Sequence, residues 1–489
     1  MSTLATTEAS ARDAKLPLAV DLDGTLIRGD LFVEAMLRFV SAKPWRLFTL
    51  LAWLMRGRAY AKARLAEAAP FDPADLPYDE RFLAWLRAER AQGRVLVLAT
   101  ATNRRAALAV AEHIGIFNAV FASDAQTHLK GERKAQALQE AFPAGFVYAG
   151  NEDADERVWR AAHGAVIVNA PAALTRRVAR EHGLEAKFAR PRSSPRALLT
   201  AMRPRQWVKN VLVFLPMVVA HAWGDIGAWR DAVLAFAALS LSASSVYLVN
   251  DAADIDADRR HPRKRRRPFA SGALHPAIGL GAAAVLAALG VALGLLTGAA
   301  LFVVGYLVIS TLYTFWLKRI HLLDVFVLGG LYMIRVVLGA VATGYAASTW
   351  FLAFCCFAFF SLALVKRVGE LGVASAHGVR GARSYLPTDV PILKMMGLSA
   401  AFVACLVLAL YLQDTTVRAT YSEPFLLWAV PACLVFWLCR LWLLTDRGEV
   451  DDDPLVFTLR DPVSWALGLV ATAAYAGAVL LPGHYIRWS

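Results

Sequence analysis

The sequence predicts two unlike halves: an N-terminal α/β domain with a parallel sheet, and a C-terminal all-α membrane domain of about nine transmembrane helices. Of the 489 residues, 57% are hydrophobic and only 19% are charged, whereas soluble domains average about 45–50% and about 25%. Short apolar segments alternate with helical stretches before residue 190, and long apolar runs follow residue 200. This composition excludes a disordered chain and an ordinary soluble enzyme.

The first half is expected to be an α/β domain at residues 16–187, with a helical cap at about 31–92. Apolar strand segments begin at residues 16, 94, 119, 146 and 165, and helical stretches separate them. Residues 1–15 lack the apolar core of a signal peptide, so we expect a flexible N-terminus that stays in the cytosol. Residues 188–200, rich in Pro, Ser and Arg, predict a basic linker at a membrane surface.

The second half, residues 201–489, contains nine apolar runs that approach the ~20 residues needed to cross a bilayer. They lie at residues 208–224, 230–250, 277–296, 299–317, 322–343, 350–365, 395–413, 424–444 and 464–481. The loop at 251–276 carries seven basic residues, whereas the segments expected outside carry only Arg418 and Arg487. This asymmetry predicts an inner-membrane protein whose loop and N-terminal domain face the cytosol. Topology thus explains the basic run in a chain of net charge +13, so no nucleic-acid partner is expected.

In the first half, the string DLDGT (21–25) directly follows an apolar strand. A second strand reaches Thr100, Lys134 follows, and an acidic loop ends the series at Asp155. In this order the motifs resemble the haloacid dehalogenase (HAD) superfamily, and the resemblance covers about residues 16–187.

This resemblance implies an α/β phosphatase with a parallel Rossmann-like sheet. Asp21 would be the nucleophile that attacks the phosphate and Asp23 the general acid and base. Thr100 would hold the phosphoryl group, and Lys134 would neutralise its charge. Mg²⁺ would be held by Asp21, Asp23 and Asp155.

One departure from the family pattern leaves two alternatives open. The metal loop of the family usually begins Gly-Asp, whereas this chain has Gly150-Asn151. Asparagine offers a carbonyl oxygen to Mg²⁺ but no charge. Either neighbouring acids compensate and the domain is an active phosphatase, or it is a catalytically weak scaffold.

The helical stretch at 31–69 resembles the small cap over HAD sites and is rich in Leu, Phe, Trp and Arg. One interpretation is an interfacial amphipathic helix that brings the site to a lipid substrate. The other is an ordinary, buried pair of cap helices.

The main signal in the second half is the string NDAADIDADRRHPRKRRRP (250–268). On a continuous helix, Asp251, Asp254 and Asp258 share one face. Three carboxylates on one face repel one another unless divalent cations lie between them, and Mg²⁺ also bridges to diphosphate. Asn250 and Asp251 at a membrane boundary are therefore expected to line a polar cavity.

With nine spans, the pattern N-D-x-x-D-x-x-x-D resembles the UbiA superfamily of intramembrane prenyltransferases, over about residues 198–485. The resemblance implies a helical bundle around a cavity, in which Asp251, Asp254 and Asp258 bind Mg²⁺-diphosphate as catalytic residues. Members that move a prenyl group usually carry a second acidic pair. Here Asp324 is present, but Leu328 stands where the second acid is expected.

Three further strings, MRPRQWVKN (202–210), LVKRVGEL (364–371) and DPLVFTLRDP (453–462), resemble the polyprenyl-phosphate phosphoribosyltransferases, of the decaprenyl-phosphate kind. That branch moves 5-phosphoribose from phosphoribosyl diphosphate to a polyprenyl phosphate lipid. Such substrates carry several anions and call for several cations. The expected substrate-binding residues are Lys209, Asn250, Arg259, Lys264, Arg335, Lys366 and Arg367.

Together, the halves predict a bifunctional membrane enzyme that uses Mg²⁺. The helical domain would form a polyprenylphosphoryl ribose, and the HAD-like domain would remove its 5-phosphate. One alternative is a UbiA-type transferase that moves a polyprenyl chain from its diphosphate to an aromatic or other small acceptor. A further alternative is a non-enzymatic lipid-binding scaffold. The lipid chain length, the pathway and the oligomeric state stay open.

Overall fold

The computed structural model describes residues 15–124, 129–189, 195–376, 385–450 and 453–481. The chain divides into two compact units: residues 1–201 with 248–282, and residues 202–247 with 283–489. The expected flexible N-terminus, apart from Lys15, lies outside the described residues, as do residues 190–194 of the expected linker.

The first unit is built on a six-stranded parallel sheet in the order β3-β2-β1-β4-β5-β6. The strands are β1 (Leu18–Val20), β2 (Leu96–Asn103), β3 (Ala119–Ser123), β4 (Val147–Gly150), β5 (Gly164–Val168) and β6 (Leu184–Phe188). Leu18 of β1 pairs with Leu96 on one side and with Val147 on the other. Strands β1, β4 and β5 are wholly buried, as parallel strands covered on both faces must be.

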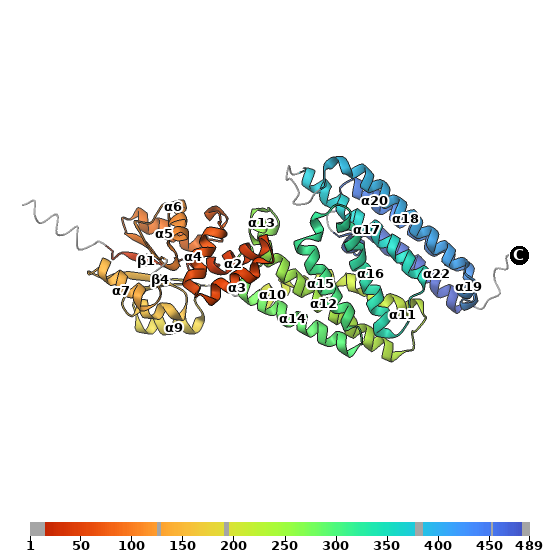
Figure 1. Cartoon of the computed structure of the whole chain (residues 1–489), viewed down its shortest axis with the longest axis horizontal. Coiled ribbons are helices and arrows are strands. Elements are labelled where there is room, and N and C mark those ends of the chain that lie inside the picture. Colours follow the sequence, from red (N-terminus) through yellow and green to blue (C-terminus); the bar gives the residue numbers. More distant parts are fainter. Residues whose placement is uncertain (1–14, 125–128, 190–194, 377–384, 451–452, 482–489) are drawn as a thin grey trace, which may run out of the picture. The chain divides into compact units, whose positions relative to one another are not determined.

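Helices cover both faces of this sheet, which confirms the predicted α/β class (Figure 1). On one face lie α5 (Glu80–Ala91) and α6 (Arg104–Ile114), and on the other α7 (Glu132–Ala141), α8 (Glu156–Trp159) and α9 (Ala172–Glu181). Each helix turns an apolar stripe to the strands, as Phe82, Leu83 and Leu86 of α5 show.

Three helices lie between β1 and β2 in the stretch where a cap was expected: α2 (Leu31–Ala42), α3 (Arg46–Met55) and α4 (Arg58–Ala68). We call these three helices the cap; α5, which also falls within the expected bounds of 31–92, packs on the sheet instead. Asp30 caps the N-terminus of α2, where its side chain accepts hydrogen bonds from the backbone N–H groups of Phe32 and Val33. The three helices share a small apolar cluster built from Phe39, Leu50 and Leu65. The single turns η1 (Pro73–Asp75) and η2 (Asp153–Asp155) and the helix α10 (Pro195–Ala201) complete this part.

Residues 248–282 also belong to the first unit. They comprise the end of α12 (Ile226–Ala253), then α13 (Ile255–Arg260), η4 (Lys264–Arg266) and the start of α14 (Pro276–Leu296). Gly272 has a φ of +72°, and a Cβ there would lie 2.6 Å from the Cβ of Arg28. Glycine therefore permits both the turn and the close approach to the chain that follows β1.

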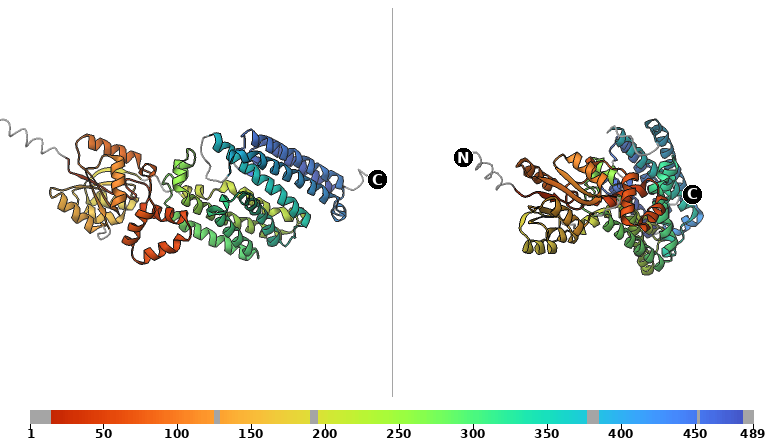
Figure 2. Two further views of the ribbon diagram at one scale, coloured as in Figure 1. Left: turned by 45° about the horizontal axis from the view of Figure 1, so that its top comes forward. Right: turned by 60° about the vertical axis from the view of Figure 1, so that its left-hand side comes forward.

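The second unit is all-helical, as predicted. It contains η3 (Pro204–Phe214), α11 (Leu215–Val219), the first part of α12, the rest of α14, α15 (Ala300–Phe315), η5 (Leu317–Arg319), α16 (Leu323–Thr343), α17 (Thr349–Ala376), η6 (Pro387–Asp389), α18 (Val390–Gln413), α19 (Thr415–Thr420), η7 (Pro424–Trp428), α20 (Ala429–Asp446), α21 (Pro454–Thr458) and α22 (Pro462–Leu480). Long helices run alongside one another, with α17 against α16 and α18, and α20 against α22 (Figure 2).

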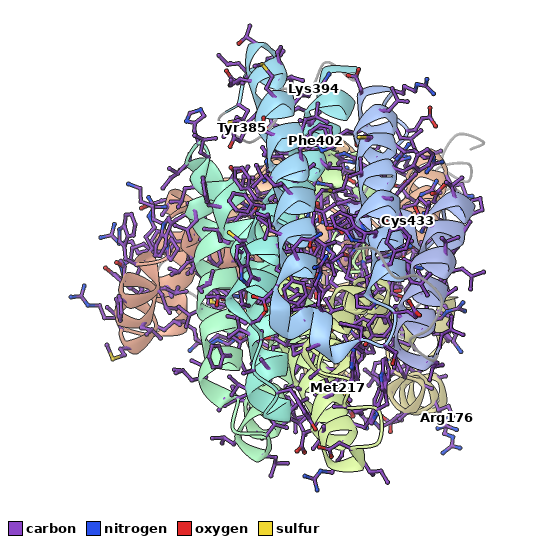
Figure 3. All side chains as sticks on the ribbon, turned by 90° about the vertical axis from the view of Figure 1, so that its right-hand side faces the viewer. Arg176, Met217, Tyr385, Lys394, Phe402 and Cys433 are labelled. Carbon is purple, nitrogen blue, oxygen red and sulfur yellow. The ribbon has the colours of Figure 1, made fainter. Side chains whose placement is uncertain are left out.

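Within the described residues, seven helices are long and apolar enough to cross a membrane, where nine spans were expected. The expected first span (208–224) is a 3₁₀ stretch followed by the five-residue α11. The expected fourth span is α15, whose 16 residues reach only about 24 Å at 1.5 Å per residue. Tyr385 and Lys394 lie at one end of this unit and Met217 at the other (Figure 3).

Candidate active sites

The first unit has a cavity of about 340 Å³ where β1, β2 and β4 end. The carboxyl ends of neighbouring parallel strands meet at one edge, so side chains distant in sequence converge there. Asp21, Asp23, Thr100, Lys134, Asn151 and Asp155 all line the cavity. The structure therefore brings together every residue expected for a phosphatase site.

A buried relay of hydrogen bonds joins Asp21 to Asp155. Lys134 Nζ donates to Asp21 Oδ1 at 2.9 Å and to the Tyr148 hydroxyl at 2.8 Å. The Tyr148 hydroxyl in turn donates to Asp155 Oδ1 at 2.8 Å. Asp155 Oδ2 accepts the backbone N–H groups of Asn151 and Glu152. Asp155 thus orients Lys134 and the loop after β4. No sequence pattern had indicated a role for Tyr148.

Burial raises the pKa values of Asp21 and Asp23 toward neutral pH. It raises the pKa of Asp21 to about 7, because Lys134 offsets the lost hydration only in part and Asp155 adds repulsion. It raises the pKa of Asp23 to about 6, with help from the Asp30 charge. Two hydrogen bonds restrain the second shift: Leu31 N donates to Asp23 Oδ1 at 2.9 Å and the Thr102 hydroxyl to Oδ2 at 2.5 Å. A carboxyl group in this pKa range can both give and take a proton.

The acids beside Asn151 have different surroundings: Glu152 and Asp155 line the same cavity, whereas Asp153 lies on the surface. Glu152 pairs with Lys130 at 3.1 Å, and Asp153 pairs with Arg177 at 2.6 Å on the surface. Asn151 itself faces the cavity, where its Oδ1 accepts the Thr25 hydroxyl at 3.2 Å. Its amide oxygen remains the uncharged donor that the sequence implied.

Part of the cavity wall comes from residues that sequence reasoning did not select. The cap contributes Arg58 and Lys62, and the segment 248–282 contributes Ser271 and His275. Lys62 Nζ donates to the Ala101 carbonyl at 3.0 Å, next to the strand end that carries Thr100. The wall around the aspartates is therefore rich in cations, as an anionic substrate requires.

The cap and the segment 248–282 are joined by a buried ion cluster. Glu34 accepts two hydrogen bonds of 2.8 Å from Arg259 and one of 3.2 Å from Arg38. Arg38 also binds Asp256 at 2.5 and 2.9 Å, and Arg260 pairs with Asp75 at 2.5 Å. Arg259, expected to bind substrate, is thus engaged by Glu34, a residue distant in sequence.

The acidic motif is not one continuous helical face. Helix α12 ends at Ala253 and α13 begins at Ile255, with Asp254 at the break (φ −97°, ψ 13°). The spacing argument for Asp251, Asp254 and Asp258 assumed an unbroken helix. Across the interruption, the backbone N–H groups of Asp254 and Asp258 still donate to the carbonyls four residues earlier. No group of three or more acidic, His or Cys side chains among the described residues is arranged to hold a metal ion.

Asp251 and Asp258 nevertheless converge, because Arg267 lies between them. Its Nη1 is 3.2 Å from Asp251 Oδ1 and 2.8 Å from Asp258 Oδ2, and both carboxylates are buried. Asn250 is half-buried at the end of α12, whereas Lys264 is exposed on η4. One cation thus already joins the two acids.

The second unit contains a buried cluster of charges around Asp453. Lys209 Nζ lies 2.6 Å from Asp453 Oδ2, Lys366 Nζ lies 3.6 Å from it, and the Tyr332 hydroxyl donates to it at 2.8 Å. Lys209 and Lys366 were expected as substrate ligands from separate strings, and the fold brings them together. Asp453 begins the string DPLVFTLRDP (453–462), but no sequence pattern indicated that it is the shared partner of the two lysines.

Arg335 joins this cluster from the middle of α16. Its Nε donates to Asn210 Oδ1 at 2.9 Å, and another nitrogen donates to the Leu331 carbonyl. Its guanidinium lies over the rings of Tyr306 and Tyr332, and Lys209 lies near the latter ring as well. Arg335 is buried inside the second unit. Among the described residues it forms no ion pair with a carboxylate.

Arg367 has a different environment from the other expected ligands. It is 0% exposed and lies 2.7 Å from Asp324, which is also 0% exposed. It also contacts Glu370 and the Tyr313 hydroxyl, and Tyr385 donates to Asp324 at 2.5 Å. We therefore expect Arg367 to join α16 to α17 instead of contacting a substrate.

Both halves match known families. Residues 211–467 match the UbiA prenyltransferase family, and residues 18–159 match the haloacid dehalogenase-like hydrolases. Protein y4nM of Sinorhizobium fredii, described as uncharacterized, is 37% identical over 475 residues, covering 96% of this chain and 92% of y4nM.

Two further similarities concern the helical part. The decaprenyl-phosphate phosphoribosyltransferase of Mycobacterium tuberculosis is 33% identical over 292 residues, which cover 58% of this chain and 94% of that enzyme. A solved UbiA homolog from Archaeoglobus fulgidus, bound to GPP and Mg²⁺, is 12% identical with a TM-score of 0.45. That alignment covers 57% of this chain and 99% of the homolog.

Proposed function

Because this chain belongs to the UbiA prenyltransferase family and carries a HAD-like domain, we propose that it catalyses two successive steps on one lipid. The helical unit transfers 5-phosphoribose from phosphoribosyl diphosphate to polyprenyl phosphate. The HAD-like domain then removes the 5-phosphate, with both sites on the cytosolic side. The name of the similar M. tuberculosis enzyme supports the first step.

The observation that carries the first step is the excess of positive charge around Asp453 among the residues that the structure describes. Lys209, Lys366 and Arg335 supply three cations, and Asp453 is the carboxylate that pairs with two of them. Buried cations without enough counter-charge are costly in a membrane protein unless an anion joins them. The donor and the acceptor both carry phosphates, which fit this requirement.

In the transfer step, a phosphate oxygen of the lipid attacks C1 of the ribose, the bond from C1 to the diphosphate breaks, and diphosphate leaves. Lys209, Lys366 and Arg335 hold phosphate oxygens and stabilise the charge that develops on the leaving group. Tyr332 and Asn210 position the cations, because each hydrogen-bonds a member of the cluster.

Both donor sets offer carboxylate or amide oxygens, the ligands that Mg²⁺ prefers. Asp251 and Asp258 already share a cation, the Arg267 guanidinium, so their oxygens can face one positive centre. Asp21, Asp23 and Asn151 line one cavity, and burial raises the pKa of both carboxyl groups, with neighbouring acids adding to the rise. In each site these residues would hold the ion, which would neutralise phosphate charge.

In the second step, the Asp21 carboxylate attacks the phosphorus of the 5-phosphate, and Asp23 gives a proton to the departing ribose oxygen. Water then hydrolyses the aspartyl phosphate and releases inorganic phosphate, with Asp23 taking the proton. Lys134 and the Thr100 hydroxyl are placed to bind the phosphoryl oxygens, since both line the cavity beside Asp21.

Transfer of a prenyl chain is the less favoured alternative. It calls for a second acidic pair near Asp324. That carboxylate is fully buried against Arg367, and Leu328 stands where the second acid is expected. This observation favours the phosphoribosyl donor.

The test uses the purified chain in lipid vesicles with ribose-labelled phosphoribosyl diphosphate and polyprenyl phosphate. We expect label in the lipid fraction, then release of phosphate. Asp21→Asn should accumulate the phosphorylated lipid, identified by mass spectrometry, whereas Asp153→Asn on the surface should behave as wild type. Lys209→Gln should abolish labelling, whereas Lys318→Gln in η5 should not.

Two results would contradict the proposal. Absence of ribose label from the lipid would exclude the first step, and prenyl transfer to an aromatic acid would replace it. Unchanged phosphate release by Asp21→Asn would exclude the second step and favour the scaffold alternative.

A further inference from the structure

One face of the cap helix α3 is apolar and exposed. Its inner face carries Leu50, which is buried against α2 and α4. Its outer face carries Leu47, Phe48, Leu51 and Met55, exposed at 45, 75, 48 and 83%, and Trp45 just before the helix is 57% exposed. We call these five residues the α3 patch.

The spacing of the α3 patch defines a single stripe. The successive intervals between positions 47, 48, 51 and 55 are one, three and four residues. This spacing places the four side chains on one side of the helix. A helix that is apolar on both sides is normally buried on both sides, in a protein core or in a membrane. Soluble surfaces rarely leave large apolar side chains grouped in this way, except where something binds.

The charges around the α3 patch identify the chemistry of its partner. No acidic residue occurs between Glu34 and Glu67. That stretch carries seven cations: Arg38, Lys43, Arg46, Arg56, Arg58, Lys62 and Arg64. Lys43 lies 5.7 Å from the ring of Trp45, and Arg56 lies 5.6 Å from the ring of Tyr60. Apolar residues flanked by cations and amphipathic rings match the interface of an anionic bilayer.

The α3 patch is separated from the lining of the phosphatase cavity by a short stretch of chain. Helix α4 follows α3 after Arg56 and Gly57, and its residues Arg58 and Lys62 line the cavity. Phe32 of α2 lines it too, and the Arg58 guanidinium lies over the Phe32 ring. A surface that α3 rests on would therefore lie beside the cavity.

We propose that the α3 patch inserts into the headgroup region of the bilayer that anchors this chain, so that the phosphatase cavity faces lipid-linked substrates. The nature of the substrate rests on the proposed function above, whereas the contact with the bilayer does not. Of the two interpretations of residues 31–69, the exposed face of α3 selects the interfacial one.

A spin-label experiment tests the contact directly. The full chain, with its five cysteines at 355, 356, 405, 433 and 439 replaced, is labelled through Phe48→Cys or through the control Leu108→Cys. Leu108 is an exposed apolar residue on α6. In vesicles of phosphatidylcholine and phosphatidylglycerol, we expect the label at 48 to meet dissolved oxygen and to be shielded from a water-soluble nickel chelate.

The label at 108 is expected to show the opposite accessibility. Equal exposure of both labels to the nickel chelate would overturn the proposal. Spin–spin broadening between labels at 48 would assign the α3 patch to a second copy of the chain, and would overturn it as well.

A kinetic experiment separates the contact from the chemistry. Phe48→Glu with Met55→Glu should lower kcat/KM for the lipid-linked phosphate in vesicles by at least about tenfold, because the local substrate concentration is lost. Hydrolysis of free ribose 5-phosphate should not change, and Leu108→Glu should affect neither substrate. An equal loss on both substrates would overturn the proposal. If the wild-type chain hydrolyses neither, the proposed phosphatase is wrong, and the spin labels still decide the membrane contact.

Discussion

The ion pair between Arg367 and Asp324 should hold α16 and α17 together without taking part in substrate binding. The two side chains are 0% exposed, and their charged atoms lie 2.7 Å apart. We propose the single changes Asp324→Leu and Arg367→Met, and their combination. The double variant removes both charges and leaves apolar side chains of related size.

The structure sets the expected magnitudes. Breaking a buried pair from one side costs about 3–5 kcal/mol, because one charge remains buried alone. The loss of stability caused by Arg367→Met should fall at the upper end of this range, because Asp324 then keeps only the Tyr385 hydroxyl among its described partners. The loss caused by Asp324→Leu should fall at the lower end, because Arg367 then keeps its contacts with Glu370 and Tyr313. The double variant should lose less than the sum, with a coupling free energy of about 2 kcal/mol or more.

The assay is equilibrium unfolding in mixed detergent micelles, with KM for phosphoribosyl diphosphate measured on the folded variants. The exposed pair of Lys394 and Asp446, changed to Met and Leu, is the matched control and should show coupling below about 1 kcal/mol. KM of the folded double variant should stay within about threefold of wild type. A rise of about a hundredfold would show that Arg367 binds substrate, and would refute this reasoning.

Three further predictions concern other parts of the chain. In calorimetry, Mg²⁺ should raise the Tm of the first unit more at pH 8 than at pH 6. At pH 6 the ion must displace protons from Asp21, whose pKa is about 7, and from Asp23, whose pKa is about 6. An equal rise in Tm at both pH values would contradict this prediction. Glu34→Gln should destabilise the first unit by about 3–5 kcal/mol in denaturant titration, because its buried arginine partners lose their carboxylate, and a loss below about 1 kcal/mol would count against that role. Gly339→Ala should lower stability by about 1–3 kcal/mol in detergent unfolding, because its Cβ would lie 2.1 Å from the Val213 carbonyl oxygen; a neutral result would exclude close packing of η3 on α16.

The phosphatase cavity could be predicted because its residues lie where strands end. Asp21 directly follows β1, and Thr100 lies in the neighbouring strand β2. Parallel strands bring their carboxyl ends to one edge whatever the intervening sequence. Tyr148 and Thr102 carried no such signal. Each acts through one hydroxyl whose partner is set by the packing of the sheet.

The acidic motif shows what residue spacing alone leaves open. Residues 251, 254 and 258 share a face only on a continuous helix, and the chain breaks at Asp254. Arg267 then supplies the contact that joins Asp251 to Asp258. A basic run such as that at 263–267 predicts topology, but it does not say which member turns inward.

Composition and motif order were sufficient to establish the two halves of this protein, the kind of sheet, the helical membrane domain and the families to which its motifs belong. These features follow from local patterns, namely apolar periodicity, strand-end residues and run length. Only the tertiary structure decided which charges meet. Lys209, Lys366 and Asp453 share one cluster although more than 80 residues separate each from the next, whereas Arg367, next to Lys366 in the chain, turns to Asp324 instead. Neighbouring residues on a helix point in different directions, so partners at such distances are chosen by helix packing and not by sequence.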